Sequence, residues 1–482
     1  MRQRIQIISS ILLFLFLTDT SIGQVGRPFI HDPSTITECQ GKYYTFGTGA
    51  GGLISEDGWT WRPGAVRSGG GAAPDVVKIG DRYLVVYGAT GGGLGGGHNG
   101  RILTMWNKTL DPNSPDFKYT EAIVVASSDG MEDNDAIDPG ILLDPTDGRL
   151  WLSYGTYFGF IRLVQLDPKT GSRIVGNKAM NIAIDCEATD LIYRDGWYYL
   201  LGTHGTCCDG ANSTYNIVVG RSRKVTGPYL DNMGRDMLKG GGKMVVATRG
   251  RLVGPGHFGR IVVEKGVEKM SCHYEADLDQ SGRSVLGILP LLWTDGWPVA
   301  GEKFKDGTYE IESARREYGL ELAVDFTRMP GGPRGFNRNN DEPVKPVPSQ
   351  QLDDVIRMWP TGNISIRLSD YMDRPHQKWT ITDAPDTTGY LGTPYYKIVI
   401  AGTERALAAT GEGEVTSVPT FTGAPEQLWR IDQLIDGSYR IMPKFVPGSG
   451  KQLALVSSGD STPTLAEFDF NSDNSKWHFR MH

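Results

Sequence analysis

The sequence predicts an all-β protein whose first part is a five-bladed β-propeller, and three observations support this. Glycine is abundant, at 63 of 482 residues, and 10% of the chain is aromatic, which is typical of many short strands joined by turns. Beyond the first twenty residues, no long segment has apolar residues at helical spacing. A sequence motif of one acidic residue, a glycine turn and an aromatic-rich strand also recurs in units of roughly fifty residues, which favours propeller blades.

Acidic residues begin four of the five repeated units. The units are Asp32 with residues 41–46, Asp75 with 80–87, Asp138 with 147–154, Glu187 with 195–200, and a fifth from about Gly256 to Trp293. The first strand of a blade lines the central channel, so these carboxylates are expected to converge on the propeller axis. Burying them is costly unless they have partners or a function. A surface aspartate that caps a turn would explain one copy, but not repetition in phase with the blades.

The first 23 residues predict a cleaved secretory signal. Arg2 and Arg4 precede an apolar run over residues 5–17, and small residues follow at 21–23 before Gln24. The run is short for a membrane span, and its order of charge, apolar run and small residues is that of a signal peptide. We therefore expect a secreted or periplasmic protein without a membrane span.

Charge and cysteine usage exclude several classes of partner and site. The net charge is -7 and the charged residues form no long runs, so neither a nucleic acid nor an anionic membrane surface is an expected partner. The five cysteines cannot all pair, and the adjacent Cys207 and Cys208 would need strained geometry to bridge each other. Histidines and cysteines show no zinc spacing, and no nucleophile elbow is present. We expect a monomer.

The C-terminal part carries a second repeat. Five prolines between 330 and 348 predict a linker over 326–350, after a propeller domain at 24–325. The motifs His376–Trp379, Glu426–Trp429 and Asn474–Trp477 then recur, although Ser475 replaces the glutamine in the third. This recurrence of Gln-x-Trp resembles a ricin-type β-trefoil module. The resemblance implies a carbohydrate-binding-like domain over 351–482, with the tryptophans in its core.

Ordered motifs in the propeller identify a family resemblance. The motifs are His31–Ser34, Ala73–Asp75, Asn134–Pro139, Cys186–Ala188, Gly254–His257, and a longer stretch from Cys207 to Tyr229 that includes Ser213–Tyr215. Together they resemble glycoside hydrolase family 43, especially its arabinan-degrading members, over about residues 26–300. The resemblance implies a five-bladed catalytic propeller.

The resemblance also implies catalytic roles for three carboxylates. Asp32 would be the general base that activates water, and Glu187 the general acid. Asp138 would orient the acid and keep its pKa high by like-charge repulsion. If the two carboxyl groups are roughly 6.5–9.5 Å apart, water fits between them and the anomeric centre inverts. His257 would lie on the axis and help to hold Ca²⁺ or Na⁺ through water; the alternative is a satisfied core histidine.

Four further residues are predicted to contact the sugar. His31 lies beside the base, and Asp75 either lines a subsite or caps a turn. Phe158 is the expected stacking platform, with packing between blades as its alternative, and Arg260 could donate to a hydroxyl group.

The leading hypothesis is a secreted inverting enzyme that cleaves α-L-arabinofuranosyl linkages in plant arabinan or pectin side chains, with a cell-wall polysaccharide or oligosaccharide as partner. A β-xylosidase, an exo-β-galactanase and a non-catalytic glycan-binding propeller remain alternatives.

Overall fold

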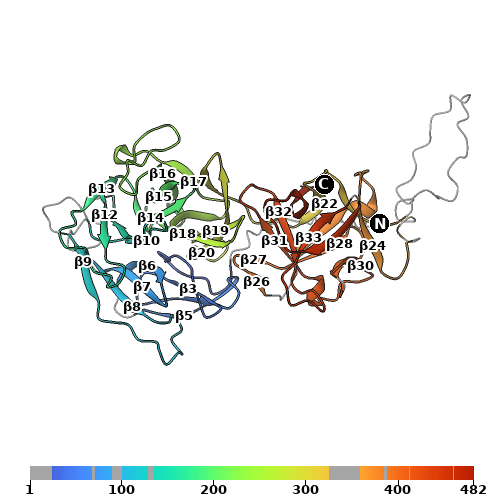
Figure 1. The fold of residues 1–482 in the computed structure, drawn as a ribbon, viewed down its shortest axis with the longest axis horizontal. Helices are drawn as coiled ribbons and strands as arrows, with labels where there is room; N and C mark the ends of the chain where they lie inside the picture. The colour runs from blue at the N-terminus through green and yellow to red at the C-terminus, as the bar shows by residue number, and fades with distance from the viewer. Residues whose placement is uncertain are drawn as a thin grey trace, which may run out of the picture.

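The structure, a computed structural model, describes residues 24–67, 71–89, 100–128, 135–157, 159–324, 356, 359–384, 388–411, 413–459 and 461–481. Nearly every regular element in these ranges is a strand, and a five-bladed propeller is joined to a second β domain (Figure 1). The predicted all-β fold is confirmed. The predicted signal segment, the predicted linker and Phe158 lie outside the described residues. No helix in the described ranges has the length and apolar character needed to cross a membrane.

Each blade is one sheet whose strands follow each other in the chain. Blade 1 contains β1 (Val25–Gly26), β2 (Thr37–Cys39), β3 (Lys42–Phe46), β4 (Gly51–Ser55) and β5 (Thr60–Val66). Blade 2 contains β6 (Ala72–Ile79), β7 (Arg82–Ala89), β8 (Arg101–Asn107) and β9 (Ile123–Ser127). Blade 3 contains β10 (Gly140–Leu143), β11 (Leu150–Tyr154), β12 (Ile161–Leu166) and β13 (Met180–Ala183). Blade 4 contains β14 (Glu187–Arg194), β15 (Trp197–His204), β16 (Asn216–Ser222) and β17 (Lys243–Val246), with the short 3-10 helices η1 (Gly210–Asn212) and η2 (Met237–Lys239). Blade 5 contains β18 (Leu252–Glu264), β19 (Val267–Asp277), β20 (Arg283–Thr294) and β21 (Trp297–Ala300).

The recurring sequence motif of a glycine turn and an aromatic-rich strand folds as a tight turn followed by a buried strand. Gly80 and Gly196 have φ of 62° and 79° in the turns that lead into the second strands of blades 2 and 4, a backbone region open to glycine at little cost. The strand after such a turn is covered on both faces by neighbouring blades, so the whole run Tyr83–Tyr87 of β7 is buried. This explains its continuous apolar sequence.

The ring closes between blades 1 and 5 through a short segment at residues 28–30. The backbone N–H of Leu286 donates to the carbonyl of Pro28 at 2.8 Å, and Phe29 forms a bridge with Val285. Apolar side chains from both blades, including Ile30, Leu53 and Ile288, form one buried cluster behind this junction. We call the junction the blade 1–5 seam.

The second domain is built from three similar lobes. Its main sheet contains β22 (Gly307–Ser313), β23 (Gly319–Leu322), β24 (Ile364–Ser369), β25 (Trp379–Asp383), β28 (Tyr396–Ile400), β29 (Ala406–Ala409), β30 (Val415–Val418), β31 (Trp429–Gln433), β32 (Tyr439–Pro443) and β35 (Trp477–Met481). Two hairpins accompany it, β26 (Gly389–Tyr390) with β27 (Thr393–Pro394) and β33 (Ala454–Ser458) with β34 (Thr462–Ala466). The 3-10 helices are η3 (Pro375–Gln377), η4 (Pro425–Gln427) and η5 (Asp473–Ser475).

The three motif tryptophans lie in the core of this domain, as their resemblance implied. Trp379, Trp429 and Trp477 are fully buried. Each indole N–H donates to a backbone carbonyl, at 2.7, 2.9 and 2.8 Å respectively, which satisfies its polar atom inside the apolar core. These tryptophans hold the trefoil together and do not present a surface to a ligand.

The division between the domains differs from the predicted one. Residues 307–324 were assigned to the propeller, but β22 pairs with β35 and β25, and β23 pairs with β24. The trefoil therefore begins with β22, and the proline-rich segment interrupts its first lobe. Proline content indicated an irregular segment, but could not show that strands on its two sides belong to one sheet.

The trefoil contacts the propeller at the blade 1–5 seam. The N–H groups of Leu391 and Gly392, between β26 and β27, donate to the carbonyls of Asp57 and Gly58 at 2.8 and 2.9 Å. The Leu391 side chain completes the buried cluster of the seam. From blade 5, the Lys269 ammonium donates to the carbonyl of Leu391 at 2.8 Å and lies 3.3 Å from the Asp432 carboxylate. The hairpin thus bridges the first and last blades.

Replacing Leu391 with alanine is expected to destabilise the seam. Removing a leucine side chain that is 2% exposed should lower the free energy of unfolding by about 2–5 kcal/mol, since it leaves a cavity. Denaturant unfolding followed by tryptophan fluorescence measures this. Met372→Ala, at a side chain that is 54% exposed, is the matched control. Equal effects of the two substitutions would show that the hairpin does not support the seam.

Candidate active site

Each blade has one residue with a strained backbone in, or just before, the strand nearest the axis. Asp32, Ala73, Asp138, Ala188 and His257 have φ of 52°, 43°, 51°, 47° and 57°. None is a glycine, so each conformation costs of order 1–3 kcal/mol, and such residues concentrate at functional sites. Three of the five were predicted to carry chemistry. The strain repeats with the blades and aims side chains at the channel where the innermost strands meet.

Asp32 is partly buried and lies among histidines. One carboxylate oxygen lies 2.9 Å from His31 Nδ1 and 3.3 Å from His257 Nδ1, and the Thr48 hydroxyl donates to the other oxygen. Burial opposes the charge, but the neighbouring histidines hold the pKa of Asp32 well below its usual range. Burial lowers the pKa of His257 itself to about 4, so His31 supplies the positive charge at neutral pH. Asp32 is therefore an ionised carboxylate, the form a general base needs.

A second carboxylate holds His31 in its charged form. Glu275 Oε1 lies 3.0 Å from His31 Nε2 and 3.3 Å from His273 Nε2. Although burial opposes it, hydrogen bonds to Asp32 and Glu275 raise the pKa of His31 to about 10. The backbone N–H of Asp32 donates to His273 Nδ1 at 3.2 Å, so the His273 proton sits on Nε2 and is donated to Glu275. Asp32, His31, Glu275 and His273 thus form a chain of alternating carboxylates and imidazoles.

Glu187, the first residue of β14, has the opposite electrostatic environment. It is buried, and its Oε1 accepts a hydrogen bond from the Tyr215 hydroxyl. Burial, followed by the charges of Asp32 and Glu275, raises the pKa of Glu187 to about 8. One oxygen is held by Tyr215, which leaves the other to carry a proton. The site therefore contains an ionised carboxylate and a protonated one, the pairing that acid–base chemistry requires.

Asp138 lies beside Glu187 and is also buried. Burial and the charges of Glu187 and Asp32 raise its pKa well above the usual range, and it accepts a hydrogen bond from the N–H of Ala188. This bond fixes the backbone next to Glu187, which fits the predicted orienting role. The repulsion between Asp138 and Glu187 acts on both carboxyl groups, and the charges of Asp32 and Glu275 also act on Glu187.

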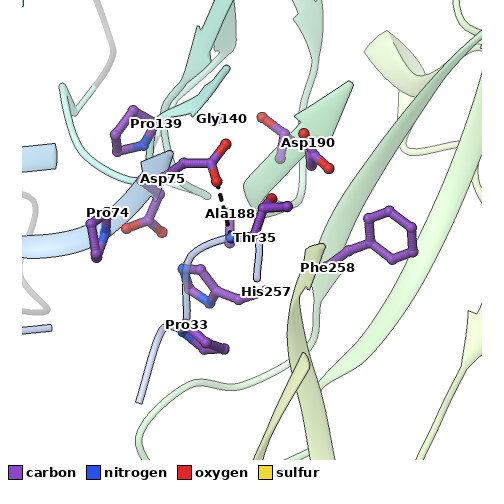
Figure 2. A pocket seen from close by; sticks show the side chains of 12 residues that line it. Pro33, Thr35, Pro74, Asp75, Pro139, Gly140, Ala188, Asp190, His257 and Phe258 are labelled. Atoms are coloured by element: carbon purple, nitrogen blue, oxygen red, sulfur yellow. Dashed lines mark hydrogen bonds between the residues drawn. The ribbon is translucent and has the colours of Figure 1, made fainter. Parts of the chain in front are cut away.

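A small cavity of about 20 Å³ lies on the axis next to these groups. Figure 2 shows Asp75, Asp190 and His257 around it, and Asp138 also contributes to its wall. Neither His257 ring nitrogen makes a hydrogen bond within the described part of the chain. A cavity of this size takes a water molecule or a small cation. The carboxyl groups of Asp138 and Asp190 and the imidazole of His257 are donors that would fit Ca²⁺ or Na⁺ held partly through water.

Two predicted sugar contacts have other roles in the structure. The two Asp75 oxygens accept the backbone N–H groups of Thr35 and Ile141, each at 3.0 Å, so Asp75 ties blade 2 to blades 1 and 3. Figure 2 shows the hydrogen bond to Thr35. Arg260 donates from Nε and Nη2 to Glu268 at 2.9 and 2.8 Å, and from Nη1 to the carbonyl of Tyr193 at 3.2 Å. Its donors are directed to these groups, and within the described ranges Arg260 has no hydrogen bond or ion pair with Asp32, Asp138 or Glu187.

Sequence reasoning missed several residues of the site. Tyr215, Thr48, His273, Glu275 and Asp190 contact the carboxylates or line the axial cavity. Tyr215 belongs to a motif that was noticed, but its partner was not. Glu275 lies on the second strand of its blade, where the repeated sequence motif has no acidic residue.

The cysteine pair also differs from the expectation. Cys207 and Cys208 form a disulfide with each other. Their sulfur atoms and a ring nitrogen of His31 all lie within 4.8 Å of one another. The bridge is therefore part of the mouth of the site.

Comparisons with known proteins agree with the propeller and trefoil architecture. The family model "Glycosyl hydrolases family 43" matches residues 48–298, and the model "Ricin-type beta-trefoil lectin domain-like" matches residues 375–467.

Several curated proteins are similar to this chain over more than half of its length, and two of them are enzymes with extracellular arabinan-degrading names. The extracellular exo-α-(1→5)-L-arabinofuranosidase ArbA of Cellvibrio japonicus is 31% identical over 312 residues, which cover 58% of this chain and 88% of that protein. The extracellular endo-α-(1→5)-L-arabinanase 1 of Bacillus subtilis is 32% identical over 301 residues, covering 57% and 88%.

Among solved structures, an exo-1,5-α-L-arabinanase from a bovine ruminal metagenomic library superimposes with a TM-score of 0.52 at 32% identity, covering 57% of this chain and 97% of that one. The α-L-arabinanase of Cellvibrio cellulosa in complex with arabinohexaose gives 0.52 at 29% identity, covering 58% and 96%.

Proposed function

The chain belongs to glycosyl hydrolases family 43, and we propose that it is a secreted, inverting enzyme that cleaves α-L-arabinofuranosyl linkages in plant arabinan. The observation that carries the proposal is the pairing of an ionised Asp32 with a protonated Glu187 in one buried channel. Relatives whose names give an α-(1→5)-L-arabinan activity support the sugar and linkage, and the extracellular relatives support export.

The proposed reaction uses both carboxyl groups in one displacement. Asp32 accepts a proton from a water molecule, whose oxygen bonds to the anomeric carbon. The glycosidic C–O bond breaks at the same time, and Glu187 gives its proton to the departing oxygen. Asp32 ends protonated and Glu187 ionised, and exchange with solvent restores both. Asp138 holds the backbone beside the acid through Ala188.

Product analysis tests the proposed linkage. We expect arabinose or arabino-oligosaccharides from linear arabinan, branched arabinan or an aryl arabinofuranoside. Oligosaccharides would indicate internal cleavage, and arabinose alone would indicate terminal cleavage. Products from xylan or galactan only would contradict the proposal and favour the β-xylosidase or galactanase alternative.

The pH profile should have an alkaline limb near pH 8. Catalysis needs a protonated Glu187, whose pKa is raised to about 8. The protonated form dominates below that pH and is lost as the pH rises through it, so kcat/KM should fall there. Because Asp32 has a lowered pKa, the base stays ionised into the acidic range. A limb at the ordinary pKa of a glutamic acid would show that Glu187 is ionised at neutral pH.

We propose that the axial cavity holds Ca²⁺ or Na⁺, with His257, Asp138 and Asp190 as the groups around it. A bound cation would offset the negative charge that these carboxyl groups place in a buried site. Binding only to the folded state raises stability, so Ca²⁺ or Na⁺ should raise the thermal midpoint of the chelator-treated protein. His257→Gln should reduce this increase. No increase with either ion would favour a buried histidine without a ligand.

A further inference from the structure

A short loop of blade 1 brings a hydroxyl group to the catalytic base. The loop joins β3 to β4, and Thr48 lies near its start. The Thr48 side chain is exposed, yet its hydroxyl donates a hydrogen bond to Asp32 Oδ2. Among the described residues, Thr48 is the group that donates a hydrogen bond to this oxygen. Packing in a core therefore does not explain why a threonine side chain is placed against the base.

The proton of the Thr48 hydroxyl has one direction open to it. The backbone N–H of Ala73, at the start of blade 2, donates to Thr48 Oγ1 at 3.1 Å. An amide N–H can only donate, so Thr48 Oγ1 is the acceptor of that bond and its single proton is left for Asp32. The hydroxyl therefore links the base to the neighbouring blade through two hydrogen bonds whose directions are fixed.

The backbone on both sides of this hydroxyl is held in place. The N–H of Thr48 donates to the carbonyl of His31 at 3.0 Å, and the N–H of Gly49 donates to the carbonyl of Gly71 at 2.8 Å. The Arg67 guanidinium, on a side chain that is 1% exposed, donates to the carbonyl of Gly49. These bonds fix Thr48 Oγ1 before any substrate binds, which is the preorganisation that a catalytic site requires.

The two carboxylate oxygens of Asp32 differ in what surrounds them. Oδ1 lies 2.9 Å from His31 Nδ1 and 3.3 Å from His257 Nδ1. Oδ2 faces the single hydroxyl of Thr48. A carboxylate oxygen has two lone pairs, so Oδ2 keeps one after it accepts the Thr48 proton. Two imidazole rings flank Oδ1, so a water molecule has better access to Oδ2.

We propose that Thr48 is a positioning residue for the reaction, whose hydroxyl holds Asp32 Oδ2 so that the free lone pair of this oxygen faces the attacking water. The proposal rests on the proposed arabinan-cleaving function and adds the group that orients its base. Without this hydrogen bond, the carboxylate rotates more freely about its χ2 torsion, which is intrinsically broad. Its reactive oxygen then spends less time aligned with the water.

Thr48→Val tests the proposal because it removes the hydroxyl and keeps the shape of the side chain. It should lower kcat on linear arabinan by about 10- to 100-fold, the usual contribution of a hydrogen bond to a charged group, and leave KM within about twofold. The loss should be equal on an aryl arabinofuranoside with an acidic phenol, because both substrates need the same attacking water. Steady-state rates measure the effect, and thermal unfolding checks the fold.

Two further variants separate the hydroxyl from the fold of the loop. Thr48→Ser keeps both the donor to Asp32 and the acceptor for Ala73, so it should recover most of the kcat that Thr48→Val loses. Thr60→Val, at an exposed threonine of β5 in the same blade, is the matched control and should leave kcat and KM unchanged. If Thr48→Ser were as impaired as Thr48→Val, the hydroxyl would not be the group that matters and the proposal would be wrong.

The pattern of the kinetic constants distinguishes the remaining outcomes. A raised KM with an unchanged kcat would show that Thr48 contacts the sugar and does not orient the base. A loss that is much larger on arabinan than on the aryl substrate would place the effect at the acid. Either result, or an unimpaired Thr48→Val in an active enzyme, would overturn the assignment of Thr48 alone. A wild type that cleaves no arabinofuranosyl substrate would instead contradict the proposed function.

Discussion

Glu187→Gln should lower kcat on arabinan by about 10²–10⁴-fold, the usual contribution of a general acid. The amide keeps the shape of the carboxyl group and can still accept the hydrogen bond from Tyr215, but it has no proton to transfer. The departing oxygen would then leave as an unprotonated alkoxide. Initial rates on arabinan, with thermal unfolding to confirm the fold, measure the effect.

The leaving group offers a control for this prediction. An aryl arabinofuranoside with an acidic phenol needs little protonation, so Glu187→Gln should be much less impaired on it than on arabinan. Asp147→Asn, at an exposed turn carboxylate, should leave both activities unchanged. If Glu187→Gln lost activity equally on both substrates, Glu187 would have a role other than the acid.

Asp32→Asn should lower kcat by a similar amount, about 10²–10⁴-fold, for the opposite reason. The amide cannot accept a proton from water, and it also removes the negative charge that faces His31 and His257. The loss should be about equal for arabinan and the activated aryl substrate, since both need the same attacking water. Steady-state rates on the two substrates distinguish this behaviour from that of Glu187→Gln.

Azide tests the role of Asp32 further. A small anion that attacks without giving up a proton does not need a base, so azide should restore turnover of the aryl substrate by Asp32→Asn and form a glycosyl azide. Azide should not restore Glu187→Gln on arabinan, where the missing step is protonation. If the loss of activity in Asp32→Asn depended on the leaving group of the substrate, Asp32 would not be the base.

The sequence was informative about the features that repeat. An acidic residue in four of the five units, in phase with turns and aromatic strands, predicted the blades and predicted that Asp32, Asp138 and Glu187 face one channel. The same regularity appears as left-handed backbone at Asp32 and Asp138. Repetition predicts convergence because equivalent positions in a ring face the same axis.

Features that do not repeat could not be predicted in this way. Arg260 was placed at the sugar by its nearness to His257 in the chain, but a register shift between Gly256 and Gly259 intervenes. Across such a bulge the alternation of faces no longer holds, and Glu268 on the next strand takes the guanidinium. The role of Glu275 could not be predicted because it rests on a contact with His31, which lies on another blade. The sequence of a single strand contains no information about such a contact.

The anomer formed first from linear arabinan tests the central claim most directly. Proton NMR at early times distinguishes the two anomers of the new reducing end before mutarotation mixes them. In the proposed reaction, the water that gives its proton to Asp32 attacks the anomeric carbon directly, and Glu187 protonates the departing oxygen. This predicts that the α-linkage yields the β-anomer first. Initial release of the α-anomer would mean a covalent glycosyl–enzyme intermediate, and would contradict the assignment of Asp32 as a base acting on water.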